Sequence, residues 1–208
     1  MRTCWILKCD IRKFFENIDH AVLVKILKEH ISDARILWLL QKVIESFFAR
    51  RPGVGLPLGN LTSQLFCNIY MNEFDQFVKH RLKAKYYIRY ADDFVLFSES
   101  RNWLEQQISP IRDFLSEKMR LALHPDKVFI KTVASGVDFL GWVNFPDHRV
   151  LRTATKRRMI RRIQESHTPE SLQSYLGLLR HGNTYASREE LLNNYRLAYN
   201  YINEVQHS

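Results

Sequence analysis

The chain of 208 residues carries 31 lysines and arginines against 22 aspartates and glutamates, which gives a net charge of +9 at pH 7. Apolar residues make up 46% of the sequence and aromatic residues 12%, so intrinsic disorder is excluded. The length predicts one domain, or one domain with a small appendage. No apolar run reaches the roughly 18 residues of a membrane span, and no signal peptide opens the sequence. The excess of cations favours an anionic partner, with nucleic acid the first expectation.

The cysteines Cys4, Cys9 and Cys67 lack the spacing of a metal site or a disulfide scaffold. Each lies among apolar neighbours, which is typical of small core residues in a reducing compartment. We therefore expect a cytoplasmic protein.

The first part of the chain mixes strand-like and helical patterns. An apolar strand should run from residue 3 to 10, and Asp19 should cap the helix that follows it. A loop rich in glycine and proline covers residues 50–59, and Asn60 should cap the next helix. The expected elements are helices over 21–30, 33–49, 60–81 and 101–119, and hairpin strands over 86–90 and 94–98.

The last part of the chain becomes helical after three short strands. Strands are expected over 128–133, 137–143 and 149–151, and helices over 155–165, 170–179 and 188–205. This order predicts an α+β core over 1–150 and an all-helical extension over 151–208.

Three aspartates carry the strongest chemical signal. Asp10 ends an apolar strand, and Asp92 and Asp93 lie at a turn between two apolar strands. Buried carboxylates are costly unless they are paired or bind a cation, and Mg²⁺ prefers oxygen ligands. A pair of aspartates in a turn is often only a surface feature. The apolar flanks favour a functional pair, and two Mg²⁺ ions on such carboxylates would support phosphoryl transfer.

The sequence Tyr90-Ala91-Asp92-Asp93 resembles the Y-x-D-D box of reverse transcriptases. Residues 10–20 resemble the first palm motif of that family, and residues 55–59 its template- and nucleotide-positioning motif. The next two blocks are similar to residues 124–127 and 139–142, and all the matches keep the family order.

The resemblance implies a polymerase palm over 1–150, with an antiparallel sheet and helices on one face, followed by a thumb-like region over 151–208. It implies that Asp10, Asp92 and Asp93 hold two Mg²⁺ ions, with Mn²⁺ as a substitute. The primer 3′ hydroxyl would then attack the α-phosphate of a dNTP. An RNA template and a DNA or RNA primer are the implied partners.

The resemblance also places residues around the incoming nucleotide. Phe15 would pack under the sugar and exclude a 2′-hydroxyl, and the alternative is that Phe14 and Phe15 are both core residues. Lys127 would neutralise phosphate charge or protonate the leaving pyrophosphate, and the alternative is a solvated lysine. The remaining implied nucleotide contacts are Ile11, Pro57, Leu58, Gly59 and Gln64.

Two residues depart from the commonest family pattern. Leu58 stands where most relatives have glutamine, and Gln64 stands where they have proline. Both features resemble reverse transcriptases of diversity-generating retroelements, which are bacterial or phage-encoded. Loss of a polar positioning contact weakens discrimination between substrates, so an error-prone polymerase is expected. The alternative is that Leu58 has no effect on fidelity.

A cationic run follows the proposed palm. One interpretation is that this run binds the phosphate backbone of a nucleic acid, and the other is that it forms a solvated charged face. The run consists of Lys156, Arg157, Arg158, Arg161 and Arg162.

The sequence also allows other functions. The chain could be a group II intron-like or retron-like reverse transcriptase. It could also be a palm and thumb that bind nucleic acid without polymerising, because the fingers expected before Asp10 are nearly absent from this sequence. A small basic accessory protein is an expected partner of the diversity-generating type.

Overall fold

The computed structural model describes residues 3–49, 51–166 and 168–206, with side chains described up to residue 198. The chain divides between Thr132 and Val133 into two compact units, here called unit 1 and unit 2. The division expected at residues 150 and 151 therefore falls earlier. The reason is packing, because Trp142 and Leu151 share a buried cluster with residues of the C-terminal helices. No helix in the described ranges is long and apolar enough to cross a membrane.

Unit 1 is built on a four-stranded antiparallel sheet in the order β2-β3-β1-β4. The first strand, β1, lies in the interior of the sheet and pairs with β3, so that Asp10 is directly opposite Asp93. β1 also pairs with β4, so residues from the two ends of the unit's sequence are neighbours in one sheet. The strands are β1 (Trp5–Asp10), β2 (Tyr86–Tyr90), β3 (Asp93–Ser98) and β4 (Phe129–Thr132).

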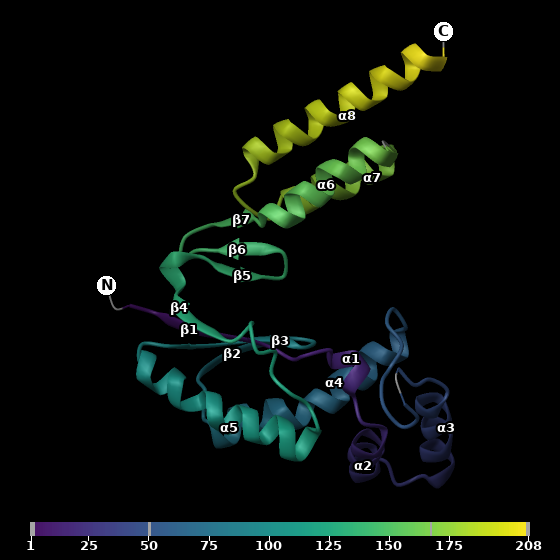
Figure 1. Ribbon diagram of the computed structural model, residues 1–208, viewed down its shortest axis with the longest axis vertical. Coiled ribbons are helices and arrows are strands. Elements are labelled where there is room, and N and C mark those ends of the chain that lie inside the picture. Colours follow the sequence, from purple (N-terminus) through teal and green to yellow (C-terminus); the bar gives the residue numbers. More distant parts are fainter. Residues whose placement is uncertain (1–2, 50, 167, 207–208) are drawn as a thin grey trace. The chain divides into compact units, whose positions relative to one another are not determined.

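Helices cover one face of this sheet (Figure 1). Side chains alternate between the two faces of a strand, and the helix-facing set of Leu7, Cys9, Phe94 and Leu96 is fully buried. The helical segments of unit 1 are α1 (Phe14–Asn17), α2 (His20–His30), α3 (Ala34–Glu45), α4 (Leu61–Gln76), the π-helical turn η1 (Phe77–Arg81) and α5 (Arg101–Met119).

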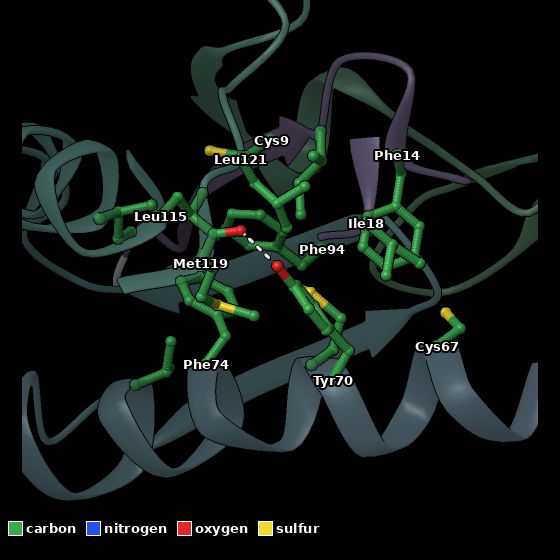
Figure 2. Close-up of a cluster of buried hydrophobic side chains, with 14 of the residues drawn as sticks. Cys9, Phe14, Ile18, Cys67, Tyr70, Phe74, Phe94, Leu115, Met119 and Leu121 are labelled. Atoms are coloured by element: carbon green, nitrogen blue, oxygen red, sulfur yellow. Dashed lines mark hydrogen bonds between the residues drawn. The ribbon is translucent and has the colours of Figure 1, made fainter. Parts of the chain in front are cut away.

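Buried Tyr70 on α4 lies next to Met119 at the end of α5 (Figure 2), and it also contacts the start of α2. The hydroxyl of Tyr70 on α4 donates a hydrogen bond of 2.5 Å to the carbonyl of Met119 at the end of α5. The same hydroxyl lies 3.4 Å from the backbone nitrogen of Asp19, the residue that caps α2. Burial raises the pKa of Tyr70, so the hydroxyl keeps its proton and remains a donor.

Unit 2 pairs a small antiparallel sheet with three helices. Leu140 and Gly141 have φ of 53° and 81° and form a tight turn, which splits the single strand expected over 137–143 into two. The elements are the short η2 (Val133–Ser135), β5 (Val137–Phe139), β6 (Trp142–Asn144), β7 (Arg149–Leu151), α6 (Thr153–Ser166), α7 (Pro169–Leu179) and α8 (Tyr185–Gln206).

Local signals located most elements and missed some of their details. Asp19 caps α2 by accepting a hydrogen bond from the backbone nitrogen of Val22, as expected. Asn60 occupies the cap position of α4 without a side-chain hydrogen bond. Cys9 and Cys67 are buried, but Cys4 is exposed near the start of β1, so its expected place in the core was wrong.

Candidate active site

The sheet brings the three candidate carboxylates to one edge. Because Asp10 and Asp93 are cross-strand partners, their side chains leave the sheet on the same face, opposite the helix-facing Cys9 and Phe94. Asp92 occupies the turn between β2 and β3. The backbone nitrogen of Ile11 donates a 3.1 Å hydrogen bond to the Asp92 carbonyl, which ties this turn to the end of β1.

Two lysines pair with these carboxylates. Lys127 Nζ lies 3.0 Å from Asp10 Oδ2, and Lys8 Nζ lies 3.0 Å from Asp93 Oδ2. Burial raises the pKa of Asp93, the charges of Asp10 and Asp92 raise it further, and Lys8 opposes the shift. Burial and the charge of Asp10 likewise raise the pKa of Asp92. Burial and mutual repulsion therefore disfavour the ionised forms of Asp92 and Asp93, and two lysines are paired with the three carboxylates.

The same groups provide a test of whether divalent ions would fit. Asp93 Oδ1 is buried and has no hydrogen-bond partner among the described residues. Mg²⁺ binds hard oxygen donors such as carboxylates. A bound cation would give this oxygen the positive partner that the described residues do not provide. In the described ranges, no three acidic, histidine or cysteine side chains already converge as a metal cluster. The chemistry of the donors suits Mg²⁺, with Lys8 and Lys127 as their present cationic partners.

A half-buried ion pair holds the turn that carries Asp92. Ala91 has a φ of 52°, which costs a residue with a Cβ roughly 1–2 kcal/mol. Arg89 Nη1 donates a 3.1 Å hydrogen bond to the Ala91 carbonyl. The other side of this guanidinium makes two bonds to Asp75 on α4, at 2.7 and 2.6 Å. Tyr87 also donates to Asp75, at 2.7 Å, so the strained turn rests on a fixed network.

A cavity of about 490 Å³ adjoins the carboxylates. Phe15 lines it and also packs against the core, whereas Phe14 is 2% exposed and belongs to the core itself. Leu58 also lines it and is 76% exposed, so its side chain makes little contact with the rest of unit 1. The predicted residues that line this cavity are Phe15, Leu58, Gly59, Gln64 and Asp92.

Two predicted nucleotide contacts lie elsewhere. The Ile11 side chain is 1% exposed and packs in the core, so only its backbone faces the carboxylate turn. Pro57 does not line the cavity.

Sequence reasoning missed Lys8, Asp75 and Arg89. A signal for Arg89 was present, because the alternation in β2 puts this charged residue on the helix-facing side of the sheet. A charge on that side requires a partner.

The cationic run lies on α6 in unit 2. Arg157, Arg158, Arg161 and Arg162 are exposed, opposite the buried Met159 and Ile163. Lys156 instead forms a 2.5 Å ion pair with Glu190 of α8, and its side chain is 32% exposed. The predicted cationic face is therefore made by the arginines, while Lys156 joins two helices.

Comparison with known proteins agrees with this geometry. Residues 1–143 match the family described as reverse transcriptase (RNA-dependent DNA polymerase). Protein YkfC of Escherichia coli is 29% identical over 73% of this chain and 48% of its own length. The group II intron-encoded protein LtrA of Lactococcus lactis is 25% identical over 74% of this chain and 36% of its own. The chain thus spans about half, or less, of the length of these relatives.

Solved structures show the fold. Apo telomerase from Candida tropicalis superposes with a TM-score of 0.62 over 98% of this chain and 42% of its own, at 14% identity. Telomerase from Candida albicans in complex with a fragment of telomeric RNA gives 0.56 over 95% of this chain and 40% of its own, at 18% identity.

The antiparallel sheet with helices on one face is the α+β palm fold of a nucleic-acid polymerase. The family match over residues 1–143 narrows this class of polymerases to one family: the chain belongs to the reverse transcriptase family.

Proposed function

We propose that this chain is the core of an RNA-directed DNA polymerase, a nucleotidyltransferase that adds dNTPs to a primer 3′ end on an RNA template. The observation that carries the proposal is the position of Asp10 opposite Asp93, with Asp92 in the adjoining turn and lining a cavity that Phe15 shares. The bacterial or phage cytoplasm is its proposed location.

In the proposed reaction, Asp10, Asp92 and Asp93 hold the divalent ions, Mg²⁺ or Mn²⁺. Such ions, when bound, activate an attacking hydroxyl and neutralise charge on the leaving group. Phe15 packs against the sugar of the incoming nucleotide and leaves no room for a 2′-hydroxyl. Lys127 exchanges its present contact with Asp10 for the triphosphate, where its ammonium neutralises charge and donates a proton to the departing pyrophosphate.

Primer extension tests this proposal. The chain is incubated with an RNA template, an annealed DNA primer, dNTPs and Mg²⁺, and product length is measured. Asp92→Asn should abolish extension. Asp113→Asn, on the exposed face of α5, is the matched control and should leave extension unchanged. Binding of the template–primer without extension by the wild-type chain would refute polymerisation and favour a palm and thumb that only bind nucleic acid.

We further propose that the polymerase is error-prone and belongs to a diversity-generating retroelement with a small basic accessory protein. The supporting observation is that Leu58, an apolar residue, lines the cavity beside Asp92, where a glutamine amide would supply a polar contact. Leu58→Gln should lower misincorporation by about 5- to 10-fold, the equivalent of one hydrogen bond of roughly 1–1.5 kcal/mol. An unchanged error rate at every template base would refute this.

A second candidate is a group II intron-type reverse transcriptase. The similarity to LtrA, a group II intron-encoded protein, favours it. The DNA on either side of the coding sequence separates the two. Intron sequence would support the second candidate, and a near-repeat differing mainly at adenines would support the first.

A further inference from the structure

A second pocket in unit 1 shares no residue with the nucleotide cavity. It has a volume of about 1060 Å³ and is lined by the outer side of α2, the end of α3, the loop over 51–54 and Arg120. Because the proposed polymerase reaction uses none of these residues, the pocket requires its own explanation.

The lining of this pocket carries uncompensated positive charge. Its two acidic groups are already paired, since Asp19 binds Arg120 at 2.6 Å and Glu45 lies 3.8 Å from Lys42. Lys25, Lys28 and Arg51 also line the pocket, and no acidic partner of theirs is found among the described residues. Cations from two segments, α2 and the loop, therefore face the same space without a counter-charge.

The pocket lining also includes an exposed aromatic ring and a buried histidine with one unpartnered ring nitrogen. The Phe48 ring lines it and is 56% exposed, so part of the ring surface is open to contact with a ligand. His20 is 5% exposed and its Nε2 donates a 2.7 Å hydrogen bond to the Gly55 carbonyl. Its Nδ1 is buried and has no partner in the described part of the chain. Among the described residues, this nitrogen and Asp93 Oδ1 are the buried polar side-chain atoms without a hydrogen-bond partner.

We propose that this pocket binds a phosphorylated nucleoside, with Lys25, Lys28 and Arg51 on the phosphates and Phe48 stacked on the base. Cations beside an exposed aromatic ring are the combination that single-stranded nucleic acid recognition uses, because every base has a face that can stack. The ligand is either a nucleotide unit of an RNA strand or a free nucleotide. This inference goes beyond the proposed polymerase function and does not depend on it.

The test measures binding, not catalysis. Fluorescence anisotropy follows a short fluorescein-labelled oligoadenylate RNA bound to the full chain in EDTA, over a range of salt concentrations. Lys25→Gln with Lys28→Gln should weaken binding on the order of tenfold and reduce the salt slope by about 1.4, or 0.7 for each lost phosphate contact. Arg112→Gln with Lys118→Gln removes the same charge from the exposed side of α5 and should change neither the affinity nor the slope.

Replacements of the ring test the base contact. Phe48→Leu should weaken RNA binding about tenfold, since base stacking contributes roughly 1–3 kcal/mol, whereas Phe48→Tyr should retain it. Competition with 5′-AMP identifies the source of the ligand. If 5′-AMP displaces the RNA from the wild-type chain but not from the Lys25 and Lys28 variant, the ligand is a free nucleotide. If 5′-AMP does not displace the RNA, the ligand is an RNA strand.

Repeating the titration with the α6 arginines replaced by glutamine removes the other proposed RNA contact. The proposal is wrong if the Arg112 and Lys118 replacements reduce affinity as much as the Lys25 and Lys28 replacements do. It is also wrong if neither Lys25 and Lys28 nor Phe48 affects binding in either background. These outcomes are independent of primer extension, so they leave the polymerase proposal intact.

Discussion

Replacing Arg89 by methionine should destabilise unit 1 and, independently of this loss, disturb the turn that carries Asp92. The Arg89 and Asp75 side chains are 10% and 30% exposed, and two hydrogen bonds join them. Burial by itself would lower the pKa of Arg89, and the contact with Asp75 outweighs it and raises the pKa, so Arg89 keeps its charge. Breaking a fully buried pair costs about 3–5 kcal/mol. Since water reaches part of Asp75, we expect a loss of about 2–3 kcal/mol.

Thermal unfolding measures this loss. For a chain of this size each kcal/mol lowers the melting temperature by about 2–4 °C, so Arg89→Met should lower it by about 4–12 °C. A double-mutant cycle with Asp75→Asn isolates the pair, and the double variant should be more stable than the sum of the single losses predicts, by about 2 kcal/mol. Tyr87→Phe is the control, because it removes one hydrogen bond to Asp75 worth about 1 kcal/mol and leaves the ion pair intact.

The cycle also has a functional readout. Arg89 Nη1 holds the Ala91 carbonyl, directly before Asp92. Well below the melting temperature, Arg89→Met should therefore raise the Mg²⁺ concentration needed for half-maximal primer extension, and Tyr87→Phe should not. If the single losses are additive, or if both variants show the same Mg²⁺ dependence, the argument that this ion pair positions the turn is refuted.

Two further changes test other parts of the fold. Burial would raise the pKa of Asp19, but hydrogen bonds from Arg120 and the Val22 backbone outweigh it and lower the pKa. Asp19 therefore contributes stability at pH values above its unfolded pKa of about 3.9, and this contribution is lost as the pH falls through the lower folded pKa. The free energy of unfolding of Asp19→Asn, measured with urea, should therefore depend less on pH in this range. In unit 2, a Cβ on Gly182 would clash with the Trp142 ring, so Gly182→Ala should cost about 1–3 kcal/mol in urea unfolding. Gly177→Ala on α7, where the space is open, should stabilise by about 0.5–1 kcal/mol, and equal effects of the two would contradict this packing.

The sequence by itself determined the elements whose signals are local. Alternation and the flanking apolar residues placed both strands around Asp92 and Asp93, and the bounds predicted for α5 match the structure. The Asp19 cap was equally readable, because a cap depends on residues within one helical turn. The ordered motifs predicted the family that residues 1–143 match.

Only the tertiary structure decided the contacts between distant segments. The register of β1 against β3 places Asp10 opposite Asp93, and Lys127 reaches Asp10 from 117 residues away. Packing buries Phe14 and leaves Phe15 at the cavity, although the two are adjacent and chemically identical. Packing also takes Lys156 out of the cationic face by pairing it with Glu190. Local patterns report how a segment folds, whereas register, burial and charge pairing depend on which segments meet, and that follows from packing of the whole unit.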